Sequence, residues 1–257
     1  MRFTVDRELE LFAESVRAAL AGWEAPLEPL FGEWQDDRDD VLAARLAAAG
    51  WEDLGADPAL LGALVAGGVE LGRAVAPLSL LDEATLGAPL RVGDRARHGE
   101  DRVAGMREAT LDGVGTLRGV ASAPSYEPVR LEAWGAATLA YLAGLASESV
   151  DRAVEHAKSR EQFGRPLAAL PAVQARLADA ALARDGLLLC AWSAASAGSG
   201  LAADELAWAG GACCEVTAHV HQVHGAVGFA LEGGVHRFHR RAKTVQVWID
   251  AVLRELH

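Results

Sequence analysis

The sequence predicts a mainly α-helical protein with an N-terminal helical domain and a C-terminal four-helix bundle. Apolar residues recur at helical spacing over most of both halves. The four longest helical stretches follow one another through short joints rich in Gly, Pro and Ser, which is typical of antiparallel bundles. The interval between the halves lacks this periodicity. We therefore expect an N-terminal helical domain at residues 1–90, a reduced middle segment at 91–128 and the bundle at 129–257.

Three helices are expected in the N-terminal domain, at residues 6–21, 41–50 and 59–75. The first carries apolar residues at the three- and four-residue spacing of one helix face. Gly50 and Pro77 are expected to end the other two, because Gly often follows a helix and Pro cannot continue one.

The middle segment is rich in Gly, Arg and Asp and has room for little regular structure. Short strand-like pieces occur at residues 102–106 and 114–120. A closed barrel of about six to eight strands needs on the order of 50 residues or more, which this interval cannot supply. We expect a hairpin or a mostly irregular link, so that a central β domain is largely missing.

The bundle helices are expected at residues 131–159, 170–197, 203–226 and 233–256. The short joints between them favour antiparallel neighbours, since a brief connection returns the chain along the helix that it has just left.

Composition argues against several classes of function. The net charge of −12 disfavours nucleic-acid binding, because phosphate contacts need a basic face. The longest apolar run, residues 59–69, is too short to span a bilayer, and the charged start does not resemble a secretory signal. Cys190, Cys213 and Cys214 lie inside helical patterns without metal-binding spacing. We expect a cytoplasmic protein with buried thiols, no membrane contact and no nucleic-acid partner.

The stretch REQFGRPL at residues 160–167 carries the first candidate site. The guanidinium of Arg160 is a planar fork of donors suited to a phosphate or diphosphate, and Gln162 lies beside it. Phe163 offers a flat apolar face, and Gly164 is expected to stop the preceding helix. The alternative is that Arg160 caps helix carbonyls and Phe163 belongs to the core.

The stretch QVHGAVGF at residues 222–229 carries the second candidate site. Its small residues allow backbone N–H groups to approach an anion closely, although a helix C-terminus has the wrong dipole for phosphate. The alternative is a plain helix stop. Nearby histidines at positions 219, 221, 224, 236 and 239 are interpreted as surface or core residues, and no metal site is expected.

Taken together, these stretches resemble the acyl-CoA dehydrogenase family. REQFGRPL followed by AVQARLADA is similar to the family's helix–turn–helix motif, and QVHGAVGF followed by HRRAK is similar to its Gln-x-x-Gly-Gly-x-Gly segment. LAAAGWEDLG and ELGRAVAPLSLL resemble its N-terminal helical domain. The resemblance implies an FAD-dependent oxidation of acyl-CoA to enoyl-CoA, in which a carboxylate removes the α proton and the flavin accepts hydride from the β carbon.

The resemblance also implies which residues hold the cofactor. In the family, both C-terminal segments reach across a subunit interface to the ADP half of an FAD whose flavin lies mainly on the neighbouring subunit. Carried over to this chain, the cofactor-binding residues are Arg160, Gln162, Phe163, Gln222, Gly225 and Ala226.

The sequence departs from the family pattern in the cofactor motifs and at the base. Ala226 replaces the second Gly, which is costly if the position needs a positive φ. Pro171 stands where the family has a cofactor-contacting Gln. Ile249 stands at the position of the catalytic Glu, and Trp134 at the alternative base position of some relatives, so no catalytic residue is expected in this chain.

Two carboxylates lie next to these base positions in sequence. Glu132 and Asp250 are each displaced by one or two residues, which on a helix turns a side chain by roughly 100° to 200°. Neither is therefore a ready substitute for the base.

This pattern resembles the smaller, base-less subunit of heteromeric acyl-CoA dehydrogenases of the sterol side-chain type. The implied partner is a larger homologue in a 2:2 heterotetramer, with an acyl-CoA substrate and electron-transfer flavoprotein as acceptor. Two alternatives remain open. In the first, the chain is a self-sufficient enzyme whose displaced base is Asp250 or a His. In the second, it is a cofactor-free structural subunit.

Overall fold

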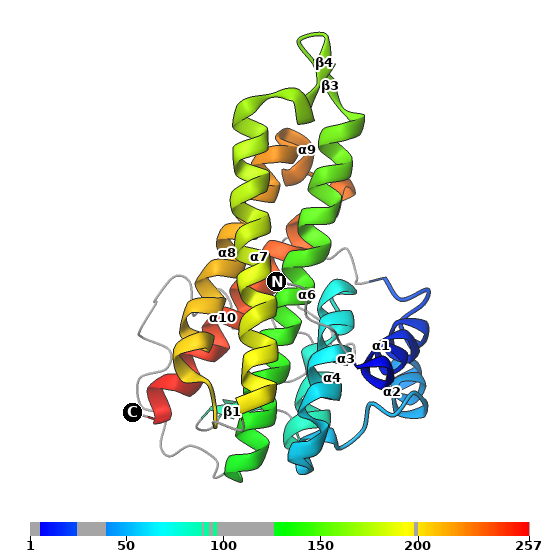
Figure 1. Ribbon diagram of the computed structural model, residues 1–257, viewed down its shortest axis with the longest axis vertical. Coiled ribbons are helices and arrows are strands. Elements are labelled where there is room, and N and C mark those ends of the chain that lie inside the picture. The colour runs from blue at the N-terminus through cyan, green and yellow to red at the C-terminus, as the bar shows by residue number, and fades with distance from the viewer. Residues whose placement is uncertain are drawn as a thin grey trace.

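The fold is almost entirely helical, as the sequence predicts. The computed structural model describes residues 6–24, 40–88, 90–92, 95–96, 126–197 and 200–256. Figure 1 shows an elongated bundle of long helices, with the N-terminal helices packed along one half of its length.

The N-terminal part consists of short helices. Its elements are α1 (Arg7–Ala19), α2 (Asp40–Ala48), the 3₁₀ turns η1 (Leu54–Ala56) and η2 (Pro58–Leu60), α3 (Leu61–Arg73) and α4 (Leu78–Leu86). Asp6 caps α1, because its carboxylate accepts a hydrogen bond from the Glu8 N–H. The three predicted helices are present within a few residues, and α4 is an additional helix that begins directly after Pro77.

The middle segment contributes one small hairpin to the described part of the chain. Strands β1 (Arg91–Val92) and β2 (Arg95–Ala96) pair antiparallel, with Arg91 opposite Ala96. The strand-like pieces expected at residues 102–106 and 114–120 lie outside the described residues.

The C-terminal part is the expected bundle. Its four helices are α6 (Pro128–Ser159), α7 (Pro171–Ala197), α8 (Ala203–His224) and α10 (His236–Leu256). Pro128 occupies the first turn of α6, where its missing N–H costs no hydrogen bond. Helix α10 begins three residues later than predicted, because the joint before it forms the short helix α9 (Ala226–Phe229) and the 3₁₀ turn η4 (Leu231–Gly233).

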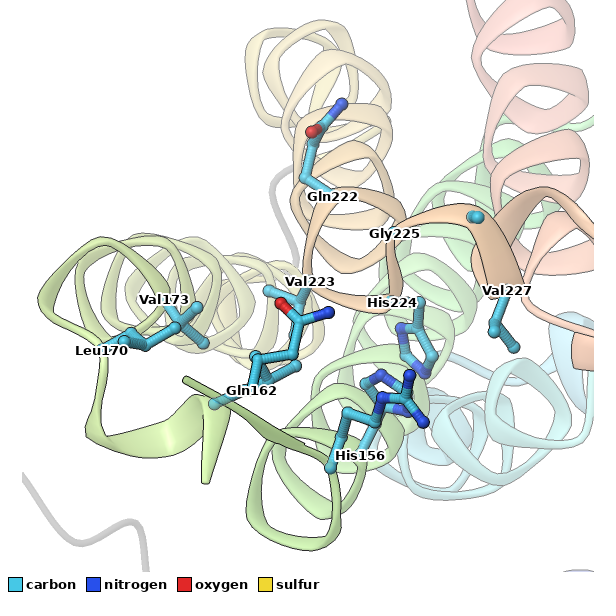
Figure 2. A pocket seen from close by; sticks show the side chains of 12 residues that line it. His156, Gln162, Leu170, Val173, Gln222, Val223, His224, Gly225 and Val227 are labelled. Atoms are coloured by element: carbon cyan, nitrogen blue, oxygen red, sulfur yellow. The ribbon is translucent and has the colours of Figure 1, made fainter. Parts of the chain in front are cut away.

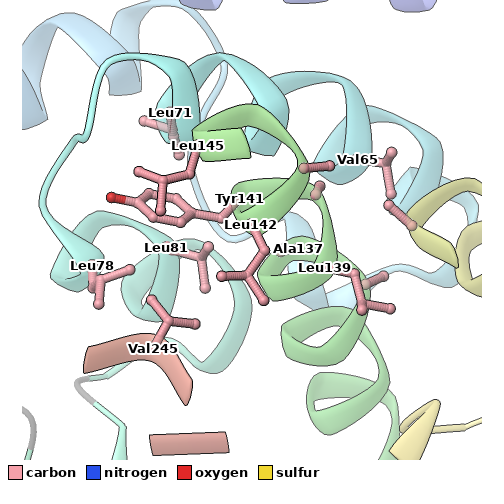
Figure 3. Packing of buried hydrophobic residues seen from close by; sticks show 14 of the residues in the cluster. Val65, Leu71, Leu78, Leu81, Ala137, Leu139, Tyr141, Leu142, Leu145 and Val245 are labelled. Carbon is pink, nitrogen blue, oxygen red and sulfur yellow. The ribbon is translucent and has the colours of Figure 1, made fainter. Parts of the chain in front are cut away.

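One hydrophobic core joins the N-terminal helices to the bundle. Figure 3 shows Leu71 of α3 and Leu78 of α4 beside Tyr141 and Leu145 of α6, with Val245 of α10 nearby. These side chains are buried and belong to the same cluster. The two helical parts therefore share their main core.

The contact between α3 and α6 is unusually close because glycine lies on both sides. A Cβ atom at Gly72 would collide with the backbone carbonyl of Tyr141, and one at Gly144 with that of Val69. Backbone cannot move aside as a flexible side chain can, so these positions require glycine.

A buried hydrogen-bond group also links the two parts. The Tyr141 hydroxyl donates to the Ala76 carbonyl at 2.7 Å, and Arg241 Nη1 donates to the same carbonyl at 3.0 Å. Arg241 Nη1 also lies 3.2 Å from the Tyr141 Oη. The loop between α3 and α4 is thereby attached to α6 and α10.

The far end of the bundle is built differently. Between α6 and α7 lie strands β3 (Glu161–Gln162) and β4 (Arg165–Pro166) and the 3₁₀ turn η3 (Leu167–Ala169). This hairpin projects from the end of the bundle away from the N-terminal helices (Figure 1). Beneath it lies a second, smaller core, formed by Ala153, Ala157, Leu167, Val220, Val223 and Val235.

Candidate functional site

A pocket lies at the hairpin end of the bundle, above the smaller core. Its volume is about 340 Å³. The polar side chains that line it come from the end of α6, from β3 and from the end of α8. They are His156, Arg160, Gln162, Gln222 and His224. The two sequence motifs, which are far apart along the chain, therefore meet at one cavity.

Five of the six residues proposed to contact the cofactor line this pocket, namely Arg160, Gln162, Gln222, Gly225 and Ala226. Figure 2 shows Gln162 inside the pocket, whereas the Gln222 amide points away from His156 and His224. The sixth residue, Phe163, does not line the pocket and is 88% exposed. The alternative that Phe163 belongs to the core is therefore wrong.

Phe163 lies at the tip of a tight hairpin. Gln162 pairs with Arg165, which leaves Phe163 and Gly164 as a two-residue loop with φ values of 57° and 72°. Two successive positive φ values are typical of a type I′ turn, in which a bulky residue at the first position is uncommon. Helix α6 already ends at Ser159, so the expectation that Gly164 stops this helix is wrong.

The guanidinium of Arg160 has no protein partner in the described part of the chain. The Arg160 backbone N–H donates to the His156 carbonyl at 2.9 Å, and its carbonyl accepts from the Leu167 N–H at 2.8 Å. The backbone is therefore fixed, while the exposed side chain makes no hydrogen bond or ion pair with a described residue. The alternative that this side chain caps helix carbonyls is not what the contacts show.

The turn after α8 depends on Gly225. Its φ of 60° and ψ of −137° belong to a region that only glycine adopts readily. The Gly225 N–H donates to the His221 carbonyl at 3.0 Å, so this amide is already satisfied. Ala226 begins α9 and is not among the residues with positive φ, so its methyl group causes none of the strain considered from the sequence.

Two histidines of the pocket, His156 and His224, were not predicted from the sequence to be site residues. The rings of His156 and His224 stack with centroids 4.4 Å apart and an interplanar angle of 24°. His224 Nδ1 lies 2.8 Å from the Val220 carbonyl oxygen. Partial burial lowers the pKa of His156, and the positive charges of His224 and Arg160 lower it further. The sequence signal was the four-residue spacing between His156, in the last turn of α6, and Arg160, directly after it.

The wall opposite the histidines is apolar. In the view of Figure 2, Leu170 and Val173 lie on one side of the pocket and His156 and His224 on the other. Pro171, where the family has a cofactor-contacting Gln, is the first residue of α7 next to this wall. The pocket thus has a basic side and an apolar side.

No carboxylate is found among the described residues that line the pocket, although the protein carries a net charge of −12. The polar lining consists of one guanidinium, two imidazoles and two amides. The guanidinium donates hydrogen bonds, each imidazole gains a second N–H donor on protonation, and each amide offers both donors and an acceptor oxygen. This chemistry fits an anion joined to an apolar or aromatic group.

The described residues contain neither a metal-binding group nor a membrane-spanning helix. In the part of the chain that the structure describes, no three His, Cys, Asp or Glu residues are grouped to hold a metal ion. Within the same residues, no helix combines the length and apolar character needed to cross a membrane. Cys213 is buried, and burial raises the pKa of the Cys214 thiol to about 11, so neither is a reactive thiolate.

The bundle is similar to a known protein family. A family model described as "Acyl-CoA dehydrogenase, C-terminal domain" matches residues 131–249. Nearly the whole bundle therefore matches the C-terminal domain of the acyl-CoA dehydrogenase family. The resemblance drawn from the two motifs is thereby confirmed.

Similar proteins agree with this assignment. The 3-sulfinopropanoyl-CoA desulfinase of Paraburkholderia xenovorans is 40% identical over 114 residues, which cover 42% of this chain and 29% of that protein. The match therefore spans less than a third of the relative's length.

Two solved structures share the fold over nearly the whole chain. The "Tcur3481-Tcur3483 steroid ACAD G363A variant" has a TM-score of 0.68 and 19% identity, covering 98% of this chain and 97% of that chain. The ChsE4-ChsE5 complex from Mycobacterium tuberculosis has a TM-score of 0.67 and 20% identity, covering 100% and 97%. At these identities the likeness is one of fold.

The two bundle positions at which the family resemblance places the catalytic base are buried. Ile249 and Trp134 are 1% and 0% exposed and belong to the main core. Glu132 is engaged elsewhere, since its Oε1 accepts from the Gly200 N–H at 3.1 Å. Burial raises the pKa of Asp250, an effect that Arg254 and Lys243 oppose.

Proposed function

We propose that this chain is a subunit of an FAD-dependent acyl-CoA dehydrogenase and binds the ADP half of an FAD shared with a larger homologous subunit. The partner supplies the catalytic carboxylate and the wall around the flavin. The observation that carries the proposal is the Arg160 guanidinium, which lacks a described protein partner in a pocket whose described lining contains no carboxylate. FAD, when bound, would accept the hydride removed from the β carbon of the acyl-CoA.

The lining of the pocket supports a nucleotide diphosphate. The Arg160 fork suits the diphosphate, and the Gln162 amide supplies a further polar contact. Leu170 and Val173 offer an apolar surface for the nucleoside. Phe163 points outward from the hairpin tip, where its exposed ring is available to a group held by a second subunit. The role of these side chains is to bind and orient the cofactor.

The outer surface of α7 supports assembly with another subunit. Leu182 and Leu189 are 75% and 47% exposed and lie seven residues apart, on the same face of the helix. Trp208 of the adjacent α8 is 46% exposed and packs against Gly186. We call Leu182, Leu189 and Trp208 the α7–α8 apolar face. Neighbouring exposed apolar side chains of this size favour a protein contact.

The proposed partner is a larger homologue in a 2:2 heterotetramer, with electron-transfer flavoprotein as the electron acceptor. The buried Ile249 and Trp134 support a base supplied by the partner, because neither can accept a proton from a substrate. The two structural neighbours, the Tcur3481-Tcur3483 steroid ACAD and the ChsE4-ChsE5 complex, also favour a heteromeric form and a steroid-related acyl group.

The test of the proposal compares two arginines of the hairpin region. Arg160→Ala removes the fork that lines the pocket, whereas Arg165→Ala removes an exposed arginine of β4 outside the pocket lining. A charge-assisted hydrogen bond contributes about 1.5–3 kcal/mol, so Arg160→Ala should weaken FAD binding to the assembled complex by about tenfold or more. Equilibrium dialysis with flavin fluorescence measures this. Equal affinities for both variants and wild type would contradict the proposal.

A second candidate is a self-sufficient enzyme with a displaced base. Two observations favour it: the raised pKa of Asp250, and the name of the desulfinase relative, which denotes a reaction other than dehydrogenation. In the proposed heteromer, Asp250→Asn and Glu132→Gln should change turnover only a few-fold, since loss of a true base costs on the order of 10²–10⁴ in rate. Loss of turnover in Asp250→Asn with FAD content unchanged would favour the second candidate. A colourless assembled complex would favour the cofactor-free structural subunit instead.

A further inference from the structure

The stacked histidines add an element that the motif residues do not account for. We propose that His156 and His224 form the proton-accepting part of the anion site, so that a diphosphate binds together with about one proton. This inference rests on the proposed FAD site and assigns two more of this chain's residues to it. It also gives cofactor retention a dependence on pH.

The ring nitrogens are arranged to become donors in the pocket. The His156 ring makes no hydrogen bond with a described residue, although it lines the cavity. Because the neighbour of His224 Nδ1 is a carbonyl oxygen, we assign the proton of the neutral ring to Nδ1, which leaves Nε2 unprotonated. A proton added to either ring creates a new N–H donor and a positive charge.

Stacking limits the pair to a single proton. With the ring centroids 4.4 Å apart, two imidazolium ions would repel each other strongly. In the protein without ligand, partial burial, His224 and Arg160 together disfavour the charged form of His156. A bound diphosphate reverses this balance, because its negative charge stabilises an imidazolium nearby.

The surroundings contain few other charges that act on the pair. The remaining lining from η3, α7, α8 and α9 is apolar, amide or backbone. A further titratable group near the pair is His221, which packs on Phe229 and on the edge of His239 and interacts electrostatically with His224. Among the described residues, the groups that shift the pKa of His156 are therefore His224 and Arg160.

The sign of the pH effect follows from proton uptake. If binding takes up a proton, affinity rises as pH falls, until the unliganded pair is itself protonated. We expect FAD to bind the assembled complex about tenfold more tightly at about pH 6 than at about pH 8. FAD is the suitable probe because its diphosphate diester does not titrate in this range, so that the change in protonation belongs to the protein.

The experiment combines variants with calorimetry. FAD binding to the assembled complex is measured in two buffers of different ionisation enthalpy, which reports the protons taken up. Wild type should take up about one proton, and the double variant His156→Gln with His224→Gln about none, because Gln keeps hydrogen-bonding capacity without titrating. The control is His219→Gln, a histidine outside the pocket that lies 3.3 Å from Arg176 and should leave proton uptake unchanged.

The outcomes separate this inference from the proposed function. If wild type binds FAD equally at both pH values without proton uptake while Arg160→Ala still weakens binding, the histidine inference is wrong and the FAD site stands. If Arg160→Ala has no effect, the proposed function fails and this inference with it. Unchanged proton uptake in His156→Gln and His224→Gln also overturns the inference. Should the variants not fold, imidazole NMR titration of wild type with and without FAD decides, and a pKa that does not rise contradicts it.

Discussion

At the scale of a single residue, Phe163 combines an unusual backbone conformation with an exposed aromatic ring. An aromatic side chain in the left-handed region is uncommon, and at 88% exposure the ring gains almost no burial from its own chain. Strained backbone persists where function requires it. The combination therefore supports a role for the ring outside this subunit.

Replacing Phe163 separates strain from binding. Asn tolerates a positive φ better, so Phe163→Asn should leave the free energy of unfolding unchanged or raise it by up to about 1 kcal/mol. The same variant should lower the FAD content of the assembled complex, because the exposed ring is lost. Denaturant unfolding and flavin absorbance measure the two effects. Undiminished flavin content would remove Phe163 from the proposed site.

At the scale of the element, the crossing of α3 and α6 sets the position of the N-terminal helices. Gly72 and Gly144 bring the two backbones together, and leucines around Tyr141 fill the remaining space. The crossing fixes the rotation of α6, which in turn directs His156 at its far end. The element thus links the main core to the pocket.

Two glycine-to-alanine variants, one at the crossing and one at an open position, test this close packing. Gly72→Ala should destabilise the protein by about 1–3 kcal/mol or more, since the added methyl meets backbone. Gly211→Ala is the matched control, because Gly211 lies inside α8 with nothing within 4 Å of an added Cβ. This control should stabilise by about 0.5–1 kcal/mol through helix propensity. Thermal unfolding distinguishes them, and equal effects would refute close packing as the reason for Gly72.

Helix positions could be predicted because each long helix repeats its apolar residues at a fixed period. Helix α4 could not, since its polar residues Ser79, Asp82 and Thr85 are buried together with its leucines, so that they do not mark an exposed face. The motifs that meet at the pocket could be identified by resemblance. The pairing of His156 with His224 could not, because it depends on how α6 is rotated against α8, which no local pattern encodes.

At the scale of the whole molecule, the chain carries a net charge of −12 and exposes the α7–α8 apolar face. Large apolar side chains on bundle helices are usually buried. Here, among the described residues, Leu182, Leu189 and Trp208 remain exposed in the single chain. We therefore expect that the isolated chain is not a stable monomer and that its physiological form contains a second subunit.

Two leucines of equal exposure test the assembly. Leu189→Glu places a charge on the α7–α8 apolar face, while Leu11→Glu places one on α1. The two side chains are 47% and 46% exposed, so intrinsic effects on folding should be similar. Leu189→Glu should shift the mass measured by light scattering toward the monomer, because burying a charge in a contact is costly. A shift of equal size in both variants would rule out this face as the interface.

The small core under the hairpin has a consequence for local unfolding. Six side chains hold the pocket end, whereas the main core extends through the rest of the molecule. Regions with little buried apolar surface open at a lower free energy than the global transition, so amide hydrogens around α9 should exchange before those of α6 near Tyr141. A ligand bridging the hairpin and α8 adds its own binding free energy to this weak end. Cofactor loading would thus protect an end of the bundle that opens more readily without it.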